Sequence, residues 1–165
     1  MIDPPKSLAA IKLIYGDITV RNGQVVAPPK WESQNMVPVR DFPLLVRPLY
    51  VHRLIVEPLR LALAGCQALN DGYMIRTIGC FAPRQKRTDP SAMSLHSWGI
   101  AVDINASTNP LILHCPTGDP RRQFGSGAFD LPEAWVKVWK AIGWMWGGDF
   151  SRSFDAMHFQ FASGA

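Results

Sequence analysis

The chain has 165 residues, of which 47% are hydrophobic and 18% charged, and its formal net charge is +4. These totals predict a single globular domain over residues 1–165 and exclude a disordered chain. Apolar runs stay well short of the about 20 residues that a membrane helix needs, which predicts no membrane span. The first residues carry no signal-peptide pattern, so we expect a chain made in the cytoplasm.

The positive charge suits an acidic partner, either an anionic cell envelope or a nucleic acid. Basic residues are scattered except at residues 84–87 and 121–122, and no nucleic-acid motif accompanies them. We therefore expect no nucleic-acid partner and interpret the two basic clusters as solvated surface. We also expect a monomer. The cysteines lack the spacing of a metal site and predict buried free thiols rather than a disulfide framework; they are Cys66, Cys80 and Cys115.

Residues 1–46 are rich in proline and lack helical periodicity. Within them, Asn22-Gly23 divides a β-prone segment at residues 18–26. This pair supplies the positive φ angles of a type I′ turn and predicts a tight β-hairpin. Residues 30–48 are expected to form an extended arm lying on the domain, with Trp31 and Met36 as anchors.

Apolar residues at spacings of three and four predict a helix over residues 49–69. Pro58 should kink or split this helix, because proline removes a donor and clashes with the preceding turn. The turn-forming residues 70–72 end it, and residues 73–81 are expected to form a strand.

A polar loop over residues 82–95 is predicted to follow, and a short buried strand over residues 100–104 comes after it. Residues 111–129 are rich in glycine and proline, so we expect a loop that borders a cleft. The final strand is expected over residues 157–161, with His158 and Gln160 on one face.

Asp130 and Glu133 have the spacing of a capping box, which predicts that Asp130 begins a helix. Trp135 and Trp139 lie on its apolar stripe, and Gly143 is placed to end it. Because helices and strands do not alternate regularly, we predict an α+β fold with a small, mainly antiparallel sheet flanked by helices.

Two short motifs carry chemistry. His96 and Asp103 lie seven positions apart, with Gly99 between them to let the backbone turn, and Asp155 precedes His158 by three positions. Two histidines and one aspartate form a three-ligand zinc set with an open position, and Asp155 is then free to handle protons. Spacing alone leaves a structural interpretation open for each residue, because an isolated histidine is more often hydrogen-bonded structure than a ligand.

Residues near these motifs are candidates for further roles in the site. Arg84 is a candidate to stabilise a developing oxyanion. Trp98 and Trp146 lie next to the motifs and are candidate cleft walls. We expect Asp149 to be a turn residue, and the two remaining histidines, His52 and His114, to be bystanders.

The same residues resemble the signature of the D-alanyl-D-alanine carboxypeptidase and L-alanyl-D-glutamate endopeptidase family, zinc peptidases of the LAS group. That signature is Ser-x-His-x-x-Gly-x-Ala-x-Asp, followed later by an acidic residue, two others and histidine. The segment from Gly79 to Arg84 resembles the family's arginine motif, and residues 146–150 resemble its Trp-Gly-Gly-Asp-Trp turn with Phe150 in the last place. The resemblance covers residues 70–162 and implies a hedgehog/DD-peptidase-like fold.

The resemblance also implies roles for individual residues. It implies one zinc ion bound by His96, Asp103 and His158, with Asp155 as base and Arg84 at the substrate carbonyl oxygen. It further implies that Ser94 helps to hold the substrate, a peptidoglycan stem peptide. No motif covers the N-terminal third.

Aspartate rather than glutamate at position 155 is more similar to the endopeptidase branch, which includes phage endolysins. We therefore expect an L-alanyl-D-glutamate endopeptidase acting as a phage or prophage endolysin and reaching the wall through a holin. One alternative is a cell-wall D-alanyl-D-alanine carboxypeptidase. Another is a non-catalytic zinc-binding structural module, which would have no need of a base at Asp155.

Overall fold

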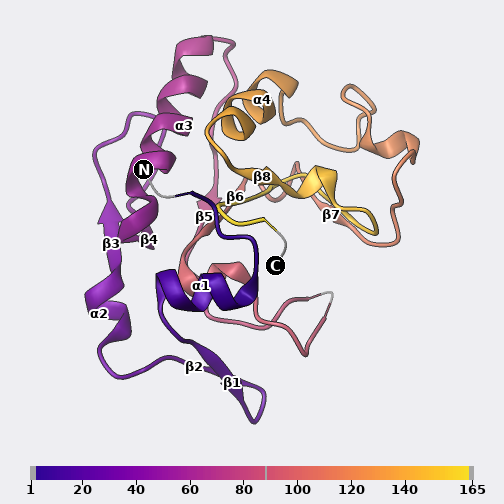
Figure 1. Cartoon of the computed structure of the whole chain (residues 1–165). Coiled ribbons are helices and arrows are strands. Elements are labelled where there is room, and N and C mark those ends of the chain that lie inside the picture. The colour runs from indigo at the N-terminus through magenta and orange to yellow at the C-terminus, as the bar shows by residue number, and fades with distance from the viewer. Residues whose placement is uncertain (1–2, 88, 164–165) are drawn as a thin grey trace.

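The computed structural model describes residues 3–87 and 89–163. They form an α+β fold of helices and small antiparallel sheets (Figure 1), as the sequence predicted. The helices are α1 (Leu8–Tyr15), α2 (Trp31–Asn35), α3 (Val56–Leu69) and α4 (Glu133–Ala141), with 3₁₀ turns η1 (Arg53–Ile55), η2 (Leu95–Trp98), η3 (Pro120–Arg122) and η4 (Gly147–Asp149). The strands are β1 (Thr19–Arg21), β2 (Gln24–Val26), β3 (Met36–Val39), β4 (Leu49–His52), β5 (Ile78–Gly79), β6 (Ala101–Ile104), β7 (Leu111–Ile112), β8 (Met145–Trp146), β9 (Phe154–Asp155) and β10 (His158–Gln160).

A central sheet with the strand order β5-β6-β10-β8 supports the rest of the molecule. Strands β6 and β10 pair in a register that sets His158 opposite Asp103. Helices α3 and α4 lie side by side on one face (Figure 1). The ring of Trp139 on α4 stacks on Phe159 of β10 at 4.6 Å between centroids. The apolar side of β10 is thereby buried, and its opposite side is left for polar residues.

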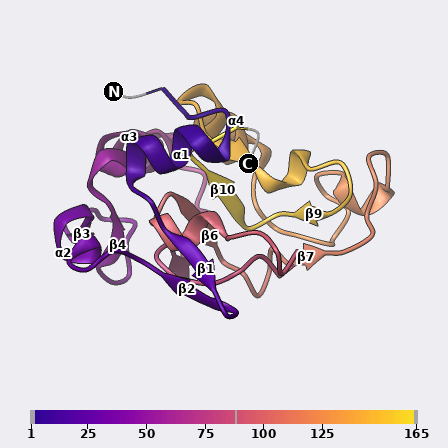
Figure 2. The ribbon, with the colours of Figure 1, turned by 60° about the horizontal axis from the view of Figure 1, so that its bottom comes forward.

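The N-terminal third is more regular than the sequence indicated. The predicted hairpin is confirmed: β1 pairs with β2, and Asn22 and Gly23 have φ angles of 49° and 75°. Helix α1 was not predicted, because only Ile11 and Tyr15 of its short length are buried and eight residues give little periodicity. Figure 2 shows α1 and the hairpin together on one side of the central sheet.

The predicted arm is partly a strand. Trp31 and Met36 are buried as expected, but β3 pairs with β4 and α2 precedes it. This pairing also corrects the start of the predicted helix over residues 49–69: residues 49–52 form a strand, whereas the helix is confirmed from Val56 to Leu69. The chain runs through β4 and η1 before α3 begins at Val56. Pro58 is therefore in the first turn of α3, where its missing N–H would have no helical partner, so it neither kinks nor splits the helix.

Two further local predictions are wrong. The strand expected over residues 73–81 reduces to β5. Asp130 does not cap α4: Pro132 holds the N-cap position, and the Asp130 carboxylate instead accepts hydrogen bonds from the hydroxyls of Tyr73 and Thr108. The local spacing predicted a helix cap, but the Asp130 carboxylate is bonded to Tyr73 and Thr108 from distant segments and is not available to the N-terminus of α4.

The expectations for the end of α4 and for the cysteines are met. Gly143, with φ of 102°, directly follows the C-cap of α4, and the three cysteines are buried and free. Within the described part of the chain, no helix is long and apolar enough to cross a membrane.

Candidate active site

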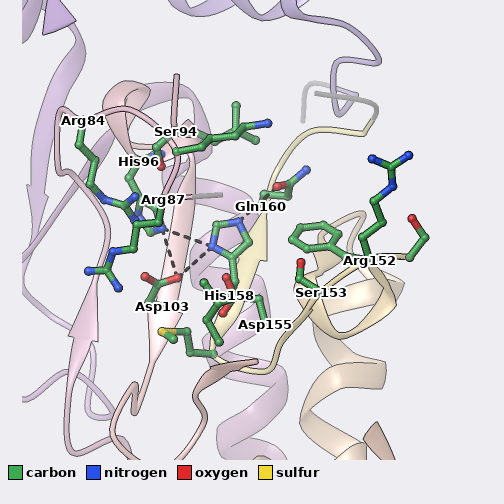
Figure 3. A pocket seen from close by; sticks show the side chains of 16 residues that line it. Arg84, Arg87, Ser94, His96, Asp103, Arg152, Ser153, Asp155, His158 and Gln160 are labelled. Atoms are coloured by element: carbon green, nitrogen blue, oxygen red, sulfur yellow. Dashed lines mark hydrogen bonds and ion pairs between the residues drawn. The ribbon is translucent and has the colours of Figure 1, made fainter. Parts of the chain in front are cut away.

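Three predicted ligands meet in one cavity (Figure 3). Asp103 Oδ1 lies 2.9 Å from His158 Nδ1 and 3.2 Å from His96 Nε2. The two ring nitrogens are 3.3 Å apart. A tetrahedral zinc with ligand bonds of about 2.0–2.1 Å would separate neighbouring donor atoms by about 3.3 Å. Two imidazoles and one carboxylate at these separations fit one zinc ion and leave a coordination position open.

Each of these three side chains is carried by a different element. Asp103 on β6 and His158 on β10 face one another through the strand register, and His96 comes from the turn η2. Gly99 ends this turn with φ of 63°, and its N–H donates to the carbonyl of His96. A Cβ at Gly99 would lie 3.0 Å from the backbone nitrogen of His52, so the positive φ angle and this close backbone contact both favour glycine here.

Two hydrogen bonds fix which ring nitrogen each histidine offers. His96 Nδ1 lies 2.6 Å from the carbonyl oxygen of Cys80, which can only accept, so the proton of neutral His96 is on Nδ1. Gln160 donates its amide to the carbonyl of Ala162 and turns its oxygen towards His158 Nε2, 3.2 Å away. Nε2 of His158 therefore donates. His96 Nε2 and His158 Nδ1 are left with their lone pairs directed at Asp103.

The cluster is electrostatically coupled. Burial alone would raise the pKa of Asp103, but hydrogen bonds and charge from His158 and His96 lower it. Burial alone would lower the pKa of His158, but the hydrogen bond and charge of Asp103 raise it. Without a cation, the coupling thus favours a proton between these two residues. A divalent cation can replace that proton and satisfy the same donor atoms.

Asp155 borders the same cavity of about 330 Å³. Burial raises the pKa of its carboxyl, and the charge of Asp103 raises it further against the opposing charges of His158, His96 and Arg84. Its Oδ1 is buried with no hydrogen-bond partner among the described residues. A raised pKa and an uncommitted oxygen are properties that a proton-transferring carboxyl needs.

Gly147 in η4 sets the position of Asp155 and His158. A Cβ there would lie 2.6 Å from the backbone oxygen of Asp155 and 3.1 Å from Cβ of His158. The second motif therefore rests directly on the Gly-Gly-Asp turn. This close approach explains why that turn accompanies the motif, whereas the sequence indicated only a reversal of the chain.

Arg84 and Ser94 also line the cavity. The Ser94 side chain accepts from the His96 N–H and caps η2, and the Ser94 N–H donates to the carbonyl of Arg84. The hydroxyl of Ser97 accepts from the Arg84 N–H and donates to its carbonyl. The backbone of Arg84 is therefore fixed to the turn that carries His96, and its side chain lies beside the ligand cluster (Figure 3).

The structure does not bring Trp98 and Trp146 to the cavity. Trp98 is 0% exposed, and its indole donates to the carbonyl of Gly16. Trp146 is 5% exposed, stacks on Phe124 and donates to the carbonyl of Ala156. Both were predicted as cleft walls because they adjoin the motifs, but their neighbours in the fold place them in the core.

The three residues expected to take no part in the site lie away from the cavity, although His52 is on a strand and not on the predicted helix. His52 is buried on β4 among the rings of Tyr15 and Trp31, His114 is exposed, and Asp149 forms an ion pair with Lys140. None of the three is among the residues that line the cavity.

The interpretation of the basic clusters as plain solvated surface is wrong in part. Lys86 and Arg87 line the cavity beside Arg84. Arg122, from the second cluster, donates to the backbone oxygens of Phe150 and of Ser153, the latter at 2.9 Å, and lies over the ring of Phe154. Arg122 thereby holds residues 150–153, which form the opposite wall and carry Arg152.

Sequence reasoning also missed the function of Gln160 as the hydrogen-bond partner of His158. The available signal was the alternation in the last strand, which places both residues on one face. The carbonyl of Cys80 had no comparable signal, because its approach to His96 depends on the path of the chain after β5.

Residues 87–161 match a family model described as D-alanyl-D-alanine carboxypeptidase. The match includes both motifs and supports a relation to the M15 zinc peptidases. Arg84 lies outside the matched residues. Comparisons with curated proteins and with solved structures found no match.

Proposed function

We propose that this zinc metallopeptidase of the peptidoglycan hydrolase type cuts the stem peptide at the L-alanyl-D-glutamate bond, through one zinc ion held by His96, Asp103 and His158. The observation that carries the proposal is the meeting of this donor set with Asp155 in one cavity. A bound zinc supplies a Lewis acid that polarises the scissile carbonyl and lowers the pKa of water towards about 7.

The chain's own residues then account for the proton transfers. Asp155 accepts a proton from the attacking water as the oxygen–carbon bond forms, and passes it to the amine nitrogen as the carbon–nitrogen bond breaks. Arg84 donates to the carbonyl oxygen, where negative charge develops. Ser94 helps to hold the substrate at the edge of the cavity.

The choice of the L-alanyl-D-glutamate bond is supported by the resemblance of the Asp155 motif to the endopeptidase branch. Residues 84–87 and 94–96 form one side and residues 150–153 the other, with the ligand cluster between them (Figure 3). A substrate peptide would lie between these two walls. The second candidate is a D-alanyl-D-alanine carboxypeptidase, which the description of the matching family model favours.

Digestion of purified stem peptides separates the two candidates. We expect fragments cut between L-alanine and D-glutamate, with none when a chelator removes the metal. Release of free D-alanine without that cut would favour the carboxypeptidase and overturn our choice.

The role as a phage or prophage endolysin is also proposed, from the resemblance of the Asp155 motif to that branch. We expect the purified protein to lyse cells whose membranes have been permeabilised, as holin-type release requires. An enzyme that trims isolated peptides but leaves permeabilised cells intact would speak against this role.

We also propose that residues 1–165 form a single peptidase domain. The indole of Trp98 donates a hydrogen bond to the carbonyl of Gly16, which joins the N-terminal third to the turn that carries His96 and supports this proposal.

A further inference from the structure

One wall of the cavity collects three positively charged side chains, of which Arg84 interacts with the charge of Asp155 and Lys86 with that of Asp89. Arg84, Lys86 and Arg87 line that wall, and Arg152 is the cation on the opposite wall. Among the described residues, none of these four side chains forms an ion pair. The acids that line the cavity are Asp103 and Asp155, which lie at the ligand cluster.

The backbone keeps these cations at the cavity edge. The Lys86 N–H donates to the carbonyl of Ala92 at 2.8 Å, and Gln85 forms a β-bridge with Met93. Lys86 is half-buried, whereas Arg87 is exposed at the rim. Like charges gathered in a hollow repel one another and create a local positive potential, which an anionic ligand would relieve.

We propose that Lys86 and Arg87 form a carboxylate-binding subsite that selects stem peptides with a free carboxylate on the residue next to the scissile bond. This inference rests on the proposed function. A dicarboxylic residue such as D-glutamate uses one carboxyl group in the chain and keeps the other free. A planar guanidinium binds such a carboxylate with two parallel hydrogen bonds, and an ammonium adds a point charge.

The position of the subsite follows from Arg84. If Arg84 contacts the scissile carbonyl oxygen, the adjoining residue of the substrate lies near the next cations along the same loop. These are Lys86 and Arg87. Arg152 stands on the other wall, where the substrate's carboxylate would be farther away (Figure 3).

The test uses two synthetic stem peptides that differ only in whether the free D-glutamate carboxylate is intact or amidated. We would measure kcat and KM at low ionic strength for the wild type, Arg87→Gln, Lys86→Gln and the matched charge loss Arg152→Gln. We expect the wild type to prefer the carboxylate peptide by about tenfold in KM, as a charge-assisted pair allows. Arg87→Gln should remove most of that preference and Lys86→Gln part of it, with kcat within about twofold, whereas Arg152→Gln should retain it.

Equal loss of preference in Arg87→Gln and Arg152→Gln would mean general attraction rather than a subsite, and would overturn the inference. So would a wild type that cleaves both peptides equally well. Binding of the two peptides to the inactive Asp155→Ala protein, followed by calorimetry, separates this inference from the proposed function. A carboxylate preference in binding without any wild-type cleavage would uphold the subsite and refute the peptidase assignment to this bond.

Discussion

Two hydrogen bonds, from His96 to Cys80 and from His158 to Gln160, determine which nitrogen each ring offers to a cation. The first uses a backbone carbonyl and is independent of the side chain at that position. The second depends on the Gln160 amide, whose own orientation is fixed by the carbonyl of Ala162. Gln160 is therefore the residue outside the ligand set whose loss should weaken zinc binding most directly.

We expect Gln160→Ala to lower zinc affinity by about 10-fold to 100-fold, because His158 loses the partner that holds its ring and tautomer. Competition with a chromogenic chelator measures this affinity. Gln160→Glu keeps an acceptor oxygen and should lose less. Equal affinities in wild type and Gln160→Ala would show that the hydrogen bond has no part in metal binding.

Asp155 is the residue that separates an enzyme from a metal-binding module. We expect Asp155→Ala to lower kcat by at least about 100-fold, the lower end of what a general base contributes, while zinc content remains that of the wild type. Asp149→Ala, which removes an exposed carboxylate from the neighbouring turn, is the control and should remain active. A fully active Asp155→Ala protein would rule out the base assignment.

Whole elements act on the site through close packing. Gly147 of turn η4 packs against the backbone of Asp155 and the Cβ of His158, and this close approach leaves no room for a methyl group at Gly147. On the opposite wall, Arg122 joins the loop after β7 to residues 150–153. Neither contact is made by a residue that takes part in the chemistry, yet both set its geometry.

The Gly147→Ala substitution should displace Asp155 and His158, because its Cβ would meet backbone 2.6 Å away. We expect at least about a 10-fold loss of kcat/KM, since small misplacements of reacting groups carry large costs. Gly79→Ala is matched, because a Cβ at Gly79 meets nothing within 4 Å. Peptide cleavage assays of both variants check this, and equal activities would contradict the packing argument.

Removing the Arg122 side chain should free residues 150–153. We expect Arg122→Ala to lose about 2 kcal/mol of unfolding free energy, in the range of hydrogen bonds to charged groups. Hydrogen exchange should also quicken in that segment. Arg121→Ala is the control: its neighbouring guanidinium pairs with Asp119 at the surface, and surface pairs contribute little. Equal unfolding free energies for Arg122→Ala and Arg121→Ala in urea denaturation would show that Arg122 does not hold residues 150–153.

At the scale of the whole molecule, the N-terminal third supports the turn that carries His96. The His52 N–H donates to the carbonyl of Gly99, and Met36 packs against the same glycine. The ring of His52 lies among Tyr15 and Trp31, where burial, followed by the charge of Arg53, lowers its pKa to about 4. This buried, neutral histidine links the stability of the packing to pH.

The unfolded chain binds a proton at His52 near pH 6.5, but the folded chain does so only near pH 4. Protonation of His52 therefore does not lower the unfolding free energy well above pH 6.5, and it lowers this free energy progressively as the pH decreases towards 4. We expect His52 to cost about 2 kcal/mol of unfolding free energy between pH 7.5 and pH 5.0. Urea denaturation in the presence of chelator, compared with His52→Asn, isolates this contribution. The same pH dependence in the variant would assign the loss to other groups.

The sequence by itself determined which side chains are available as metal ligands, and it determined the local structure that depends on a few neighbouring residues. Asn22-Gly23 required a hairpin, the alternation around Phe159 set His158 and Gln160 on one face, and each of the two motifs offered candidate zinc ligands. These features depend on backbone angles and side-chain types within a few residues of one another. They therefore leave a signal in the sequence.

Tertiary structure alone decided which of these residues meet. Asp103 and His158 are separated by 55 positions, and only the register of β6 on β10 makes them neighbours. Long-range packing also took Trp98 into the core, brought Arg87 to the cavity and made β4 from residues with helical spacing. Such outcomes depend on partners far along the chain, because burial and hydrogen bonding are satisfied by the whole fold and not by one segment.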